Sequence, residues 1–311
     1  MLNLSGRTAA LLCAMSVLLA ACGSTGGPSG AQPGQLRILA AFYPLQFIAE
    51  RVAGGHARVD SLTQPGAEPH DVELTPRQVA AVADADLVVY ERSFQAAVDE
   101  AISQSGTKRA FDTTTVVPLQ PAGRPHQEGD PGSDPSGVGK DPHVWLDPTN
   151  VATIARAVSD RLAGVDPRHA DDYRANATAL THDLSVLDGD FKHGLASCAR
   201  TEFITTHAAF GYLARRYGLT QIGISGLSPD TEPSPARMAE VQAEARAHQI
   251  TTIFYESLVS PAVAQAIASD LKLKIDVLDP VEGLTARSRG RDYLEVMRAN
   301  LTALEAANGC R

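Results

Sequence analysis

The chain has 311 residues, of which 44% are hydrophobic, and a formal net charge of −9 at pH 7. This hydrophobic content excludes a largely disordered chain, and the length allows one large or two medium domains. The acidic balance argues against a nucleic-acid partner, whose phosphates favour a basic protein surface.

The first residues, 1–21, predict an export signal. Arg7 provides the positive charge, and the apolar run Ala9–Leu19 is too short for a membrane span. The run closes on Leu-Ala-Ala followed by Cys22, the pattern of a bacterial lipobox. We expect cleavage before Cys22 and a lipid on this residue, with an ordinary secretory signal as the alternative. In both cases the protein leaves the cytoplasm.

A Gly- and Pro-rich tether, residues 22–35, comes next, and an N-terminal α/β lobe is expected over residues 36–165. Apolar runs there predict strands at Leu36–Tyr43, Arg58–Thr63, Asp86–Glu91 and Thr113–Leu119. Helical patterns lie at Pro44–Gly54, at Thr75–Ala85 and at Asn150–Val165, and a further one follows the third strand and ends at about Gln104. This alternation predicts a parallel sheet covered by helices. Residues 121–140 lack periodicity and predict a mobile surface loop.

The second half begins with a single long helical pattern over residues 166–197, which we expect to link two lobes. A C-terminal α/β lobe follows over residues 198–311. Its predicted strands are Glu202–Thr206, Thr220–Ile224, Thr251–Glu256 and Lys274–Leu278, and its predicted helices are His207–Tyr217, Ser234–His248, Pro261–Leu271 and Gly290–Asn308. The predicted fold class is therefore α/β, with two lobes of four mainly parallel strands each and a cleft between them, where such sheets bind ligands.

Two cysteines remain once the signal is removed and Cys22 is lipidated. These are Cys198 and Cys310. An exported protein with two cysteines favours a disulfide between them, with two free buried thiols as the alternative.

Three of the nine histidines follow predicted strands in short, turn-rich segments. His70 follows the second strand, His143 the fourth strand and its long loop, and His207 the first strand of the second half. Asp279 adds a carboxylate directly after the last strand. The carboxyl ends of parallel strands can all face one cleft, and three imidazoles with one carboxylate make a complete tetrahedral zinc site.

Five other histidines have polar neighbours and are interpreted as surface or structural residues: His56, His169, His182, His193 and His248. His126 lies in the predicted mobile loop and is interpreted as a solvated loop residue, with transient contact to metal as the alternative. Several acidic residues near the candidate ligands could orient the imidazoles: Glu68, Asp71, Glu73, Asp147 and Glu256.

Five segments resemble the signatures of the bacterial zinc/manganese solute-binding lipoproteins, the metal receptors of ABC importers (cluster A-I, zinc type). They are "GAEPHDVELTP", "DPHVWLDP", "DPRHADDYRANATAL", "THAAFGYLARRYGL" and "VLDPVEGL". The resemblance runs from about residue 36 to the end. It implies two α/β lobes joined by one rigid helix, with one metal ion between the lobes, held by His70, His143, His207 and Asp279.

The resemblance also implies a role. The chain is expected to be a lipid-anchored, monomeric extracytoplasmic receptor, on the periplasmic side in a Gram-negative cell. It would capture Zn²⁺ and deliver it to a membrane permease and its ATPase. Three histidines favour zinc, whereas manganese relatives often have a glutamate at the position of His207. The loop 121–140 holds only His126, which puts a role for this loop in metal capture in doubt.

Other functions stay open at this point: a manganese or iron receptor of the same family, a surface adhesin on the same scaffold, or a zinc hydrolase. The hydrolase is disfavoured because four protein ligands leave no position for a reactive water, and no HExxH pair is present. We therefore expect no enzymatic activity.

Overall fold

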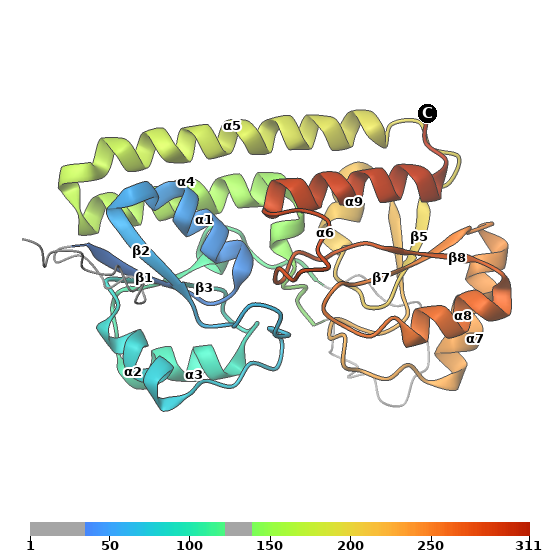
Figure 1. The fold of residues 1–311 in the computed structure, drawn as a ribbon, viewed down its shortest axis with the longest axis horizontal. Helices are drawn as coiled ribbons and strands as arrows, with labels where there is room; N and C mark the ends of the chain where they lie inside the picture. Colours follow the sequence, from blue (N-terminus) through green and yellow to red (C-terminus); the bar gives the residue numbers. More distant parts are fainter. Residues whose placement is uncertain (1–34, 122–138) are drawn as a thin grey trace, which may run out of the picture. The chain divides into compact units, whose positions relative to one another are not determined.

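The first lobe is a four-stranded parallel sheet with helices on both faces (Figure 1). The structure is a computed structural model that describes residues 35–121 and 139–311. The strand order is β2-β1-β3-β4. The strands are β1 (Leu36–Ala40), β2 (Ala57–Ser61), β3 (Leu87–Tyr90) and β4 (Ala110–Asp112), and the helices are α1 (Tyr43–Ala53), α2 (Pro76–Asp84), α3 (Ala96–Ser105) and α4 (Pro148–Val165).

The second lobe repeats this arrangement with the strand order β6-β5-β7-β8, again all parallel. Its strands are β5 (Glu202–Thr205), β6 (Thr220–Gly223), β7 (Thr252–Tyr255) and β8 (Lys274–Val277), and its helices are α6 (Gly211–Tyr217), α7 (Pro235–Ala247), α8 (Ala262–Leu271) and α9 (Tyr293–Asn308). The predicted α/β class with two parallel four-stranded sheets is confirmed.

Helix starts follow local chemistry. Thr75 caps α2 by accepting a hydrogen bond from the backbone N–H of Gln78, whose side chain bonds back to the backbone of Thr75. Asp147 caps α4 by accepting a hydrogen bond from Thr149 N, without a reciprocal side-chain bond, and proline occupies the first turn of both helices. The predicted start of α2 at Thr75-Pro76 is therefore confirmed, whereas α4 begins at Pro148, two residues before the predicted start at Asn150.

One predicted strand is wrong. Residues 113–119 do not form the fourth strand, which instead covers Ala110–Asp112 and pairs with β3. The Asp112 carboxylate accepts hydrogen bonds from the N–H and hydroxyl of Thr114, and the Thr113 hydroxyl donates to Tyr90 O. These side-chain bonds turn the chain into a 3₁₀ helix at Thr113–Thr115, despite its β-branched composition.

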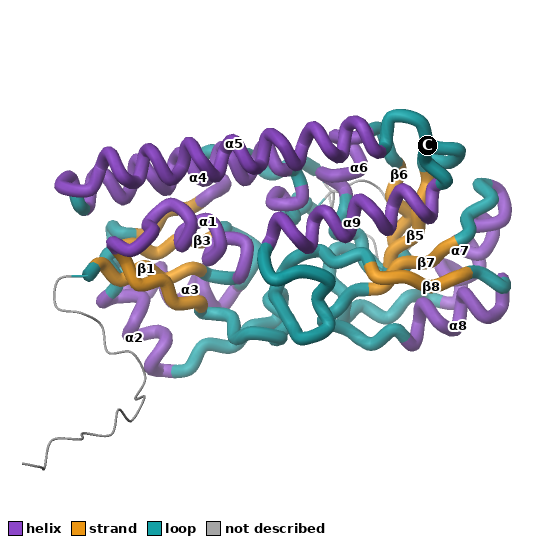
Figure 2. Tube along the Cα trace, turned by 45° about the horizontal axis from the view of Figure 1, so that its top comes forward, coloured by secondary structure: helices purple, strands orange, loops and turns teal. Residues whose placement is uncertain are grey.

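A long helix joins the lobes, as predicted. After a 3₁₀ turn at Pro167–His169, α5 (Ala170–Gly194) runs along both lobes with α9 beside it (Figures 1 and 2). Its 25 residues correspond to roughly 38 Å of helix. Asp183 forms an ion pair with Arg51 of α1 at 2.7 Å, and Asp188 forms one with Arg216 of α6 at 2.6 Å. The helix is therefore fastened to both lobes.

The core is continuous across the lobes. One hydrophobic cluster contains residues of the first sheet, α1, α4, α5, α6 and α9. A smaller cluster packs α7 and α8 against the second sheet. The predicted disulfide between Cys198 and Cys310 is present and ties the end of the chain to the start of the second lobe.

Some predictions fall outside the described residues: the signal, the lipid on Cys22, His126 and most of loop 121–140, whose ends Pro121 and Lys140 form a backbone bridge. Among the helices that the structure describes, none has the length and apolar character needed to cross a membrane.

Candidate metal centre

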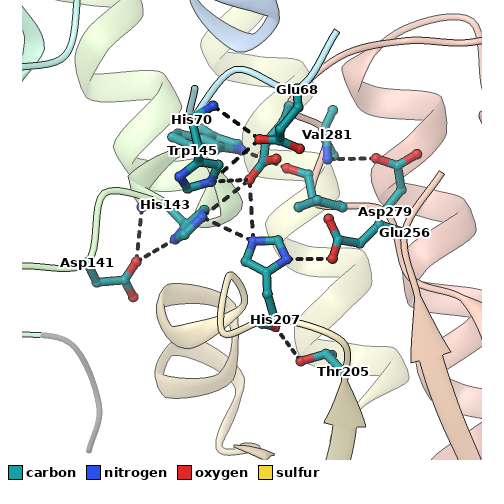
Figure 3. A network of polar contacts seen from close by, with 12 residues as sticks. Glu68, His70, Asp141, His143, Trp145, Thr205, His207, Glu256, Asp279 and Val281 are labelled. Atoms are coloured by element: carbon teal, nitrogen blue, oxygen red, sulfur yellow. Dashed lines mark hydrogen bonds and ion pairs between the residues drawn. The ribbon is translucent and has the colours of Figure 1, made fainter. Parts of the chain in front are cut away.

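Three of the predicted ligands meet at the carboxyl ends of the sheets. His70 comes from the loop after β2, His143 from the segment that enters α4, and His207 from the loop after β5. Figure 3 shows their three imidazole rings turned toward one another. His143 and His207 are fully buried, and the His70 side chain is 11% exposed.

The fourth member of the group is Glu282. Its Oε1 lies 3.4 Å from His70 Nε2, 3.3 Å from His143 Nε2 and 3.6 Å from His207 Nε2. The two buried histidines approach each other at 3.4 Å between their Nε2 atoms. One donor atom from each of the four residues lies within 4.8 Å of all the others.

These spacings fit a zinc ion. Zinc binds imidazole nitrogen and carboxylate oxygen at about 2.0–2.2 Å, so neighbouring ligand atoms of a tetrahedral site lie roughly 3.3–3.6 Å apart. Four of the six distances between donor atoms, those from Glu282 to each imidazole and that between His143 and His207, fall in that range. These four pairs are thus spaced as in a tetrahedral zinc site, and all four donor atoms lie within 4.8 Å of one another.

Two buried carboxylates orient two of the imidazoles. Asp141 Oδ1 lies 2.9 Å from His143 Nδ1, and Glu256 Oε1 lies 2.5 Å from His207 Nδ1 (Figure 3). With the proton on Nδ1 and donated to the carboxylate, each Nε2 keeps its lone pair toward the centre of the group. Two facing lone pairs and a carboxylate favour a cation between them.

The pKa shifts of His143, His207 and Glu282 also favour positive charge at this centre. Burial favours the neutral form of His143 and of His207, but hydrogen bonds and charge from neighbouring carboxylates outweigh it and raise both pKa values. Burial likewise disfavours ionised Glu282, yet its hydrogen bonds to the three imidazoles hold its pKa well below the usual range. The raised pKa values of His143 and His207 mean that, without a metal, protons on these two imidazoles compensate the negative charge of Glu282.

The structure does not bring Asp279 into this group of four. Its carboxylate accepts a hydrogen bond from Ser257 Oγ at 2.6 Å and another from Val281 N at 2.8 Å. The carboxylate that reaches the histidines belongs to Glu282, three residues further along the same loop. The segment "VLDPVEGL" contains both residues, and its glutamate is the signal that the sequence interpretation passed over.

The acidic residues predicted to surround the ligands have different positions. Glu256 orients His207, whereas Asp147 caps α4 and pairs with Arg216. Glu68 Oε1 accepts the backbone N–H of His70, and burial raises the pKa of Glu68 to about 8. Asp141, which orients His143, was not among the predicted residues.

The "DPHVWLDP" segment shows how the sequence builds one side of the centre. Pro142 precedes His143, and Val144–Leu146 forms a buried 3₁₀ helix. Trp145 is fully buried and packs edge-on against Phe42, with ring centroids 4.8 Å apart. A rigid apolar anchor therefore holds the imidazole in place.

Comparisons with known proteins agree with this geometry. A family model described as "Zinc-uptake complex component A periplasmic" matches residues 38–307. The chain belongs to this family. It is 32% identical over 303 residues to the high-affinity zinc uptake system protein ZnuA of Bacillus subtilis, covering 95% of each chain.

A second relative is the zinc-binding lipoprotein AdcA of Streptococcus pneumoniae, 37% identical over 279 residues. The match covers 88% of this chain and 56% of AdcA, so the chain spans little more than half of that relative. The crystal structure of the Zn(II)-bound ZnuA-like domain of the same AdcA superposes with a TM-score of 0.74 at 35% identity, covering 88% of this chain and 99% of that domain. The family and these relatives are described as zinc-uptake or zinc-binding proteins and not as enzymes.

Proposed function

We propose that this protein is the extracytoplasmic receptor of an ABC importer, which captures Zn²⁺ and delivers it to a membrane permease. The ligands in this proposal are His70, His143, His207 and Glu282, with Glu282 in place of Asp279. The lipid on Cys22 would hold the receptor at the membrane, and residues 22–35 would serve as its tether. The names of the zinc-binding and zinc-uptake relatives support this role.

The observation that carries the proposal is the group of four donor atoms within 4.8 Å of one another, on residues of both lobes, with Glu282 Oε1 at 3.3–3.6 Å from each of the three imidazoles. Three of the four side chains are fully buried, and two imidazoles are held by carboxylates. A site completed by four protein ligands leaves no position for a reactive water. Such a site suits a cargo that is captured and released unchanged.

The ligand set also favours zinc over manganese. Imidazole suits zinc, whereas carboxylate, carbonyl and water suit manganese, and the group supplies three nitrogens for one carboxylate. Glu282 Oε2 is buried and has no hydrogen-bond partner among the described residues, so this carboxylate could bind through one oxygen or both. Either mode leaves a nitrogen-rich site.

Chelator-competition titrations with Zn²⁺ and Mn²⁺ test the proposal. We expect one tightly bound Zn²⁺ per chain and weaker Mn²⁺ binding. His143→Ala and His207→Ala should each abolish tight binding, because each removes a buried ligand. His248→Ala is the matched control, since His248 lies at the C-terminal end of α7 and pairs with Glu202. Tight zinc binding by the His143→Ala variant, or a preference for Mn²⁺, would contradict the ligand set.

Delivery requires a separate test in the cell. A host strain lacking the protein should grow poorly when zinc is chelated. The wild-type chain should restore growth, and the His143→Ala variant should not. A Cys22→Ser variant should bind zinc normally in solution but leave the membrane fraction. Full rescue by His143→Ala would show that zinc delivery does not use this site.

A further inference from the structure

Val281 has a backbone conformation that its side chain disfavours. Its φ is +59°, in the left-handed region, although valine is β-branched and this residue is fully buried. The residue lies in the turn after β8, immediately before Glu282. A strained residue persists only where its surroundings fix it, and such residues gather at functional sites. Hydrogen bonds and packing contacts must therefore hold the turn that presents Glu282.

The Asp279 side chain supplies two of the bonds that hold it. Asp279 Oδ1 accepts the N–H of Val281 at 2.8 Å, and Oδ2 accepts the hydroxyl of Ser257 at 2.6 Å. Figure 3 shows the Val281 N–H pointing at the Asp279 carboxylate. Ser257 directly follows Glu256, which orients His207. The two residues after β7 therefore support both His207 and the turn that carries Glu282.

The backbone around Asp279 is fixed as well. Asn300 of α9 accepts from Asp279 N at 2.9 Å and donates to Asp279 O at 2.6 Å. The indole N–H of Trp145 donates to Pro280 O at 2.7 Å. Because Trp145 lies two residues after His143, one side chain connects the His143 segment to the turn that carries Glu282.

We propose that Asp279 is a positioning residue, whose carboxylate holds Val281 in the left-handed conformation and thereby aims Glu282 at the metal. The inference rests on the proposed function, because it assigns Glu282 as the ligand. Both Asp279 oxygens already accept hydrogen bonds, and Asp279 is not part of the four-residue group. It acts on the metal only through the turn.

This role predicts that the effect of losing Asp279 depends on residue 281. In an Asp279→Ala variant, Val281 loses the acceptor for its N–H and relaxes toward negative φ, which turns Glu282 away from the imidazoles. Glycine adopts the left-handed conformation without a steric penalty. An Asp279→Ala/Val281→Gly double variant should therefore keep Glu282 in place better than Asp279→Ala alone.

The experiment measures the zinc dissociation constant by chelator competition and the thermal stability of the metal-free protein. Wild type and five variants are compared: Asp279→Ala, Asp279→Asn, Val281→Gly, the double variant, and Glu282→Gln. We expect Asp279→Ala to weaken zinc binding by about tenfold or more, as is typical for residues that orient a ligand. The double variant should regain a measurable part of that loss, and Val281→Gly alone should bind nearly as wild type does.

Asp279→Asn provides a test that does not depend on a fragile variant. The amide oxygen can still accept from Val281 N, and the Ser257 hydroxyl can reverse its role, so zinc affinity should stay within about threefold of wild type. Glu282→Gln should lose far more, because a charged ligand is replaced. A loss in Asp279→Asn as large as that in Glu282→Gln would overturn the inference, since it would make Asp279 a ligand.

The remaining outcomes separate the inference from the proposed function. If wild type does not bind zinc, or if Glu282→Gln binds as wild type does, the proposed ligand set is wrong. If Glu282→Gln binds weakly while Asp279→Ala binds normally, Asp279 does not position the ligand. A lower melting temperature with equal zinc affinities in Asp279→Ala and the double variant would reduce Asp279 to a structural residue and overturn the inference.

Discussion

Glu256 offers a direct test of how a residue behind a ligand sets the affinity for metal. Its carboxylate lies 2.5 Å from His207 Nδ1 and also accepts the hydroxyl of Thr206 at 2.7 Å. Glu256 is only 2% exposed, and His207 is fully buried. A Glu256→Gln variant keeps the shape of the side chain but removes the charge that makes the imidazole a stronger donor to the metal.

The expected loss can be worked out from this contact. Partners that orient a metal-binding histidine are typically worth a factor of 10–100 in metal affinity, which corresponds to about 1.4–2.7 kcal/mol. The contact is short and buried on both sides, so we expect the loss for Glu256→Gln to lie within this range. The extra stability that saturating zinc gives should fall by the same amount, because binding to the folded state alone stabilises it by RT ln(1 + [L]/Kd).

The assay is chelator competition for the dissociation constant, followed by urea unfolding with and without zinc at a fixed free concentration. Taking the difference between the two unfolding curves removes any effect of the substitution on the metal-free protein. Glu100→Gln is the control, because Glu100 lies exposed on α3. A zinc affinity within twofold of wild type in Glu256→Gln would refute the idea that this carboxylate tunes His207.

Three further outcomes are expected. Zinc affinity measured by competition should fall as the pH drops from 8 to 5. Neighbouring carboxylates raise the pKa of His143 and favour its protonated form, which cannot bind metal. A zinc affinity that does not change with pH would contradict the histidine site. Asp188→Asn should destabilise the protein by about 1–2 kcal/mol in urea unfolding at pH 7. Hydrogen bonds from Arg216 and Lys192 outweigh the effect of burial and lower the pKa of Asp188 from 3.8 to about 2. The contribution of Asp188 to the free energy of unfolding is therefore present above pH ~4 and is lost as the pH falls through ~2. An equal difference in unfolding free energy between wild type and Asp188→Asn at pH 7 and at pH 2 would refute this. Removing the disulfide by a Cys198→Ala/Cys310→Ala substitution should cost about 2–5 kcal/mol of unfolding free energy, and adding reductant to that variant should have no further effect.

The fold could be predicted because local signals and tertiary packing agree over most of the chain. Of the eight strands in the part of the chain that the structure describes, seven lie inside the predicted ranges or extend one residue beyond them, and most of these are short apolar runs between turn signals. The exception is instructive. The Thr-Thr-Thr-Val-Val run after β4 has a strand-like composition, but Asp112 and Thr113 bond to nearby backbone and turn it. The strand pattern alone does not show that competition.

The three histidines could be predicted for a topological reason. In parallel sheets the carboxyl ends of all strands face one side, so residues that follow different strands can meet even when far apart in sequence. His70 and His207 satisfy this rule directly, and His143 does so through the rigid segment that holds Trp145. The rule gives the face of the sheet on which ligands lie. It does not give the direction of each side chain.

That missing direction explains why Glu282 was passed over. Asp279 stands closer to the strand end, but there its carboxylate meets Ser257 and the N–H of its own turn. Glu282 reaches the histidines from a turn in which Val281 is left-handed, and some of the bonds around that turn come from residues far along the chain, such as Trp145. No local pattern encodes these contacts.

The same contacts bear on how tightly the site can bind. A carboxylate on a free loop would lose conformational entropy on binding metal, and this loss would reduce affinity. Here the turn is fixed by hydrogen bonds with Asp279, Asn300 and Trp145. The imidazoles of His143 and His207 are likewise held by Asp141 and Glu256. The cost of ordering these ligands is therefore met during folding, and this leaves more of the metal–ligand interaction energy for zinc capture.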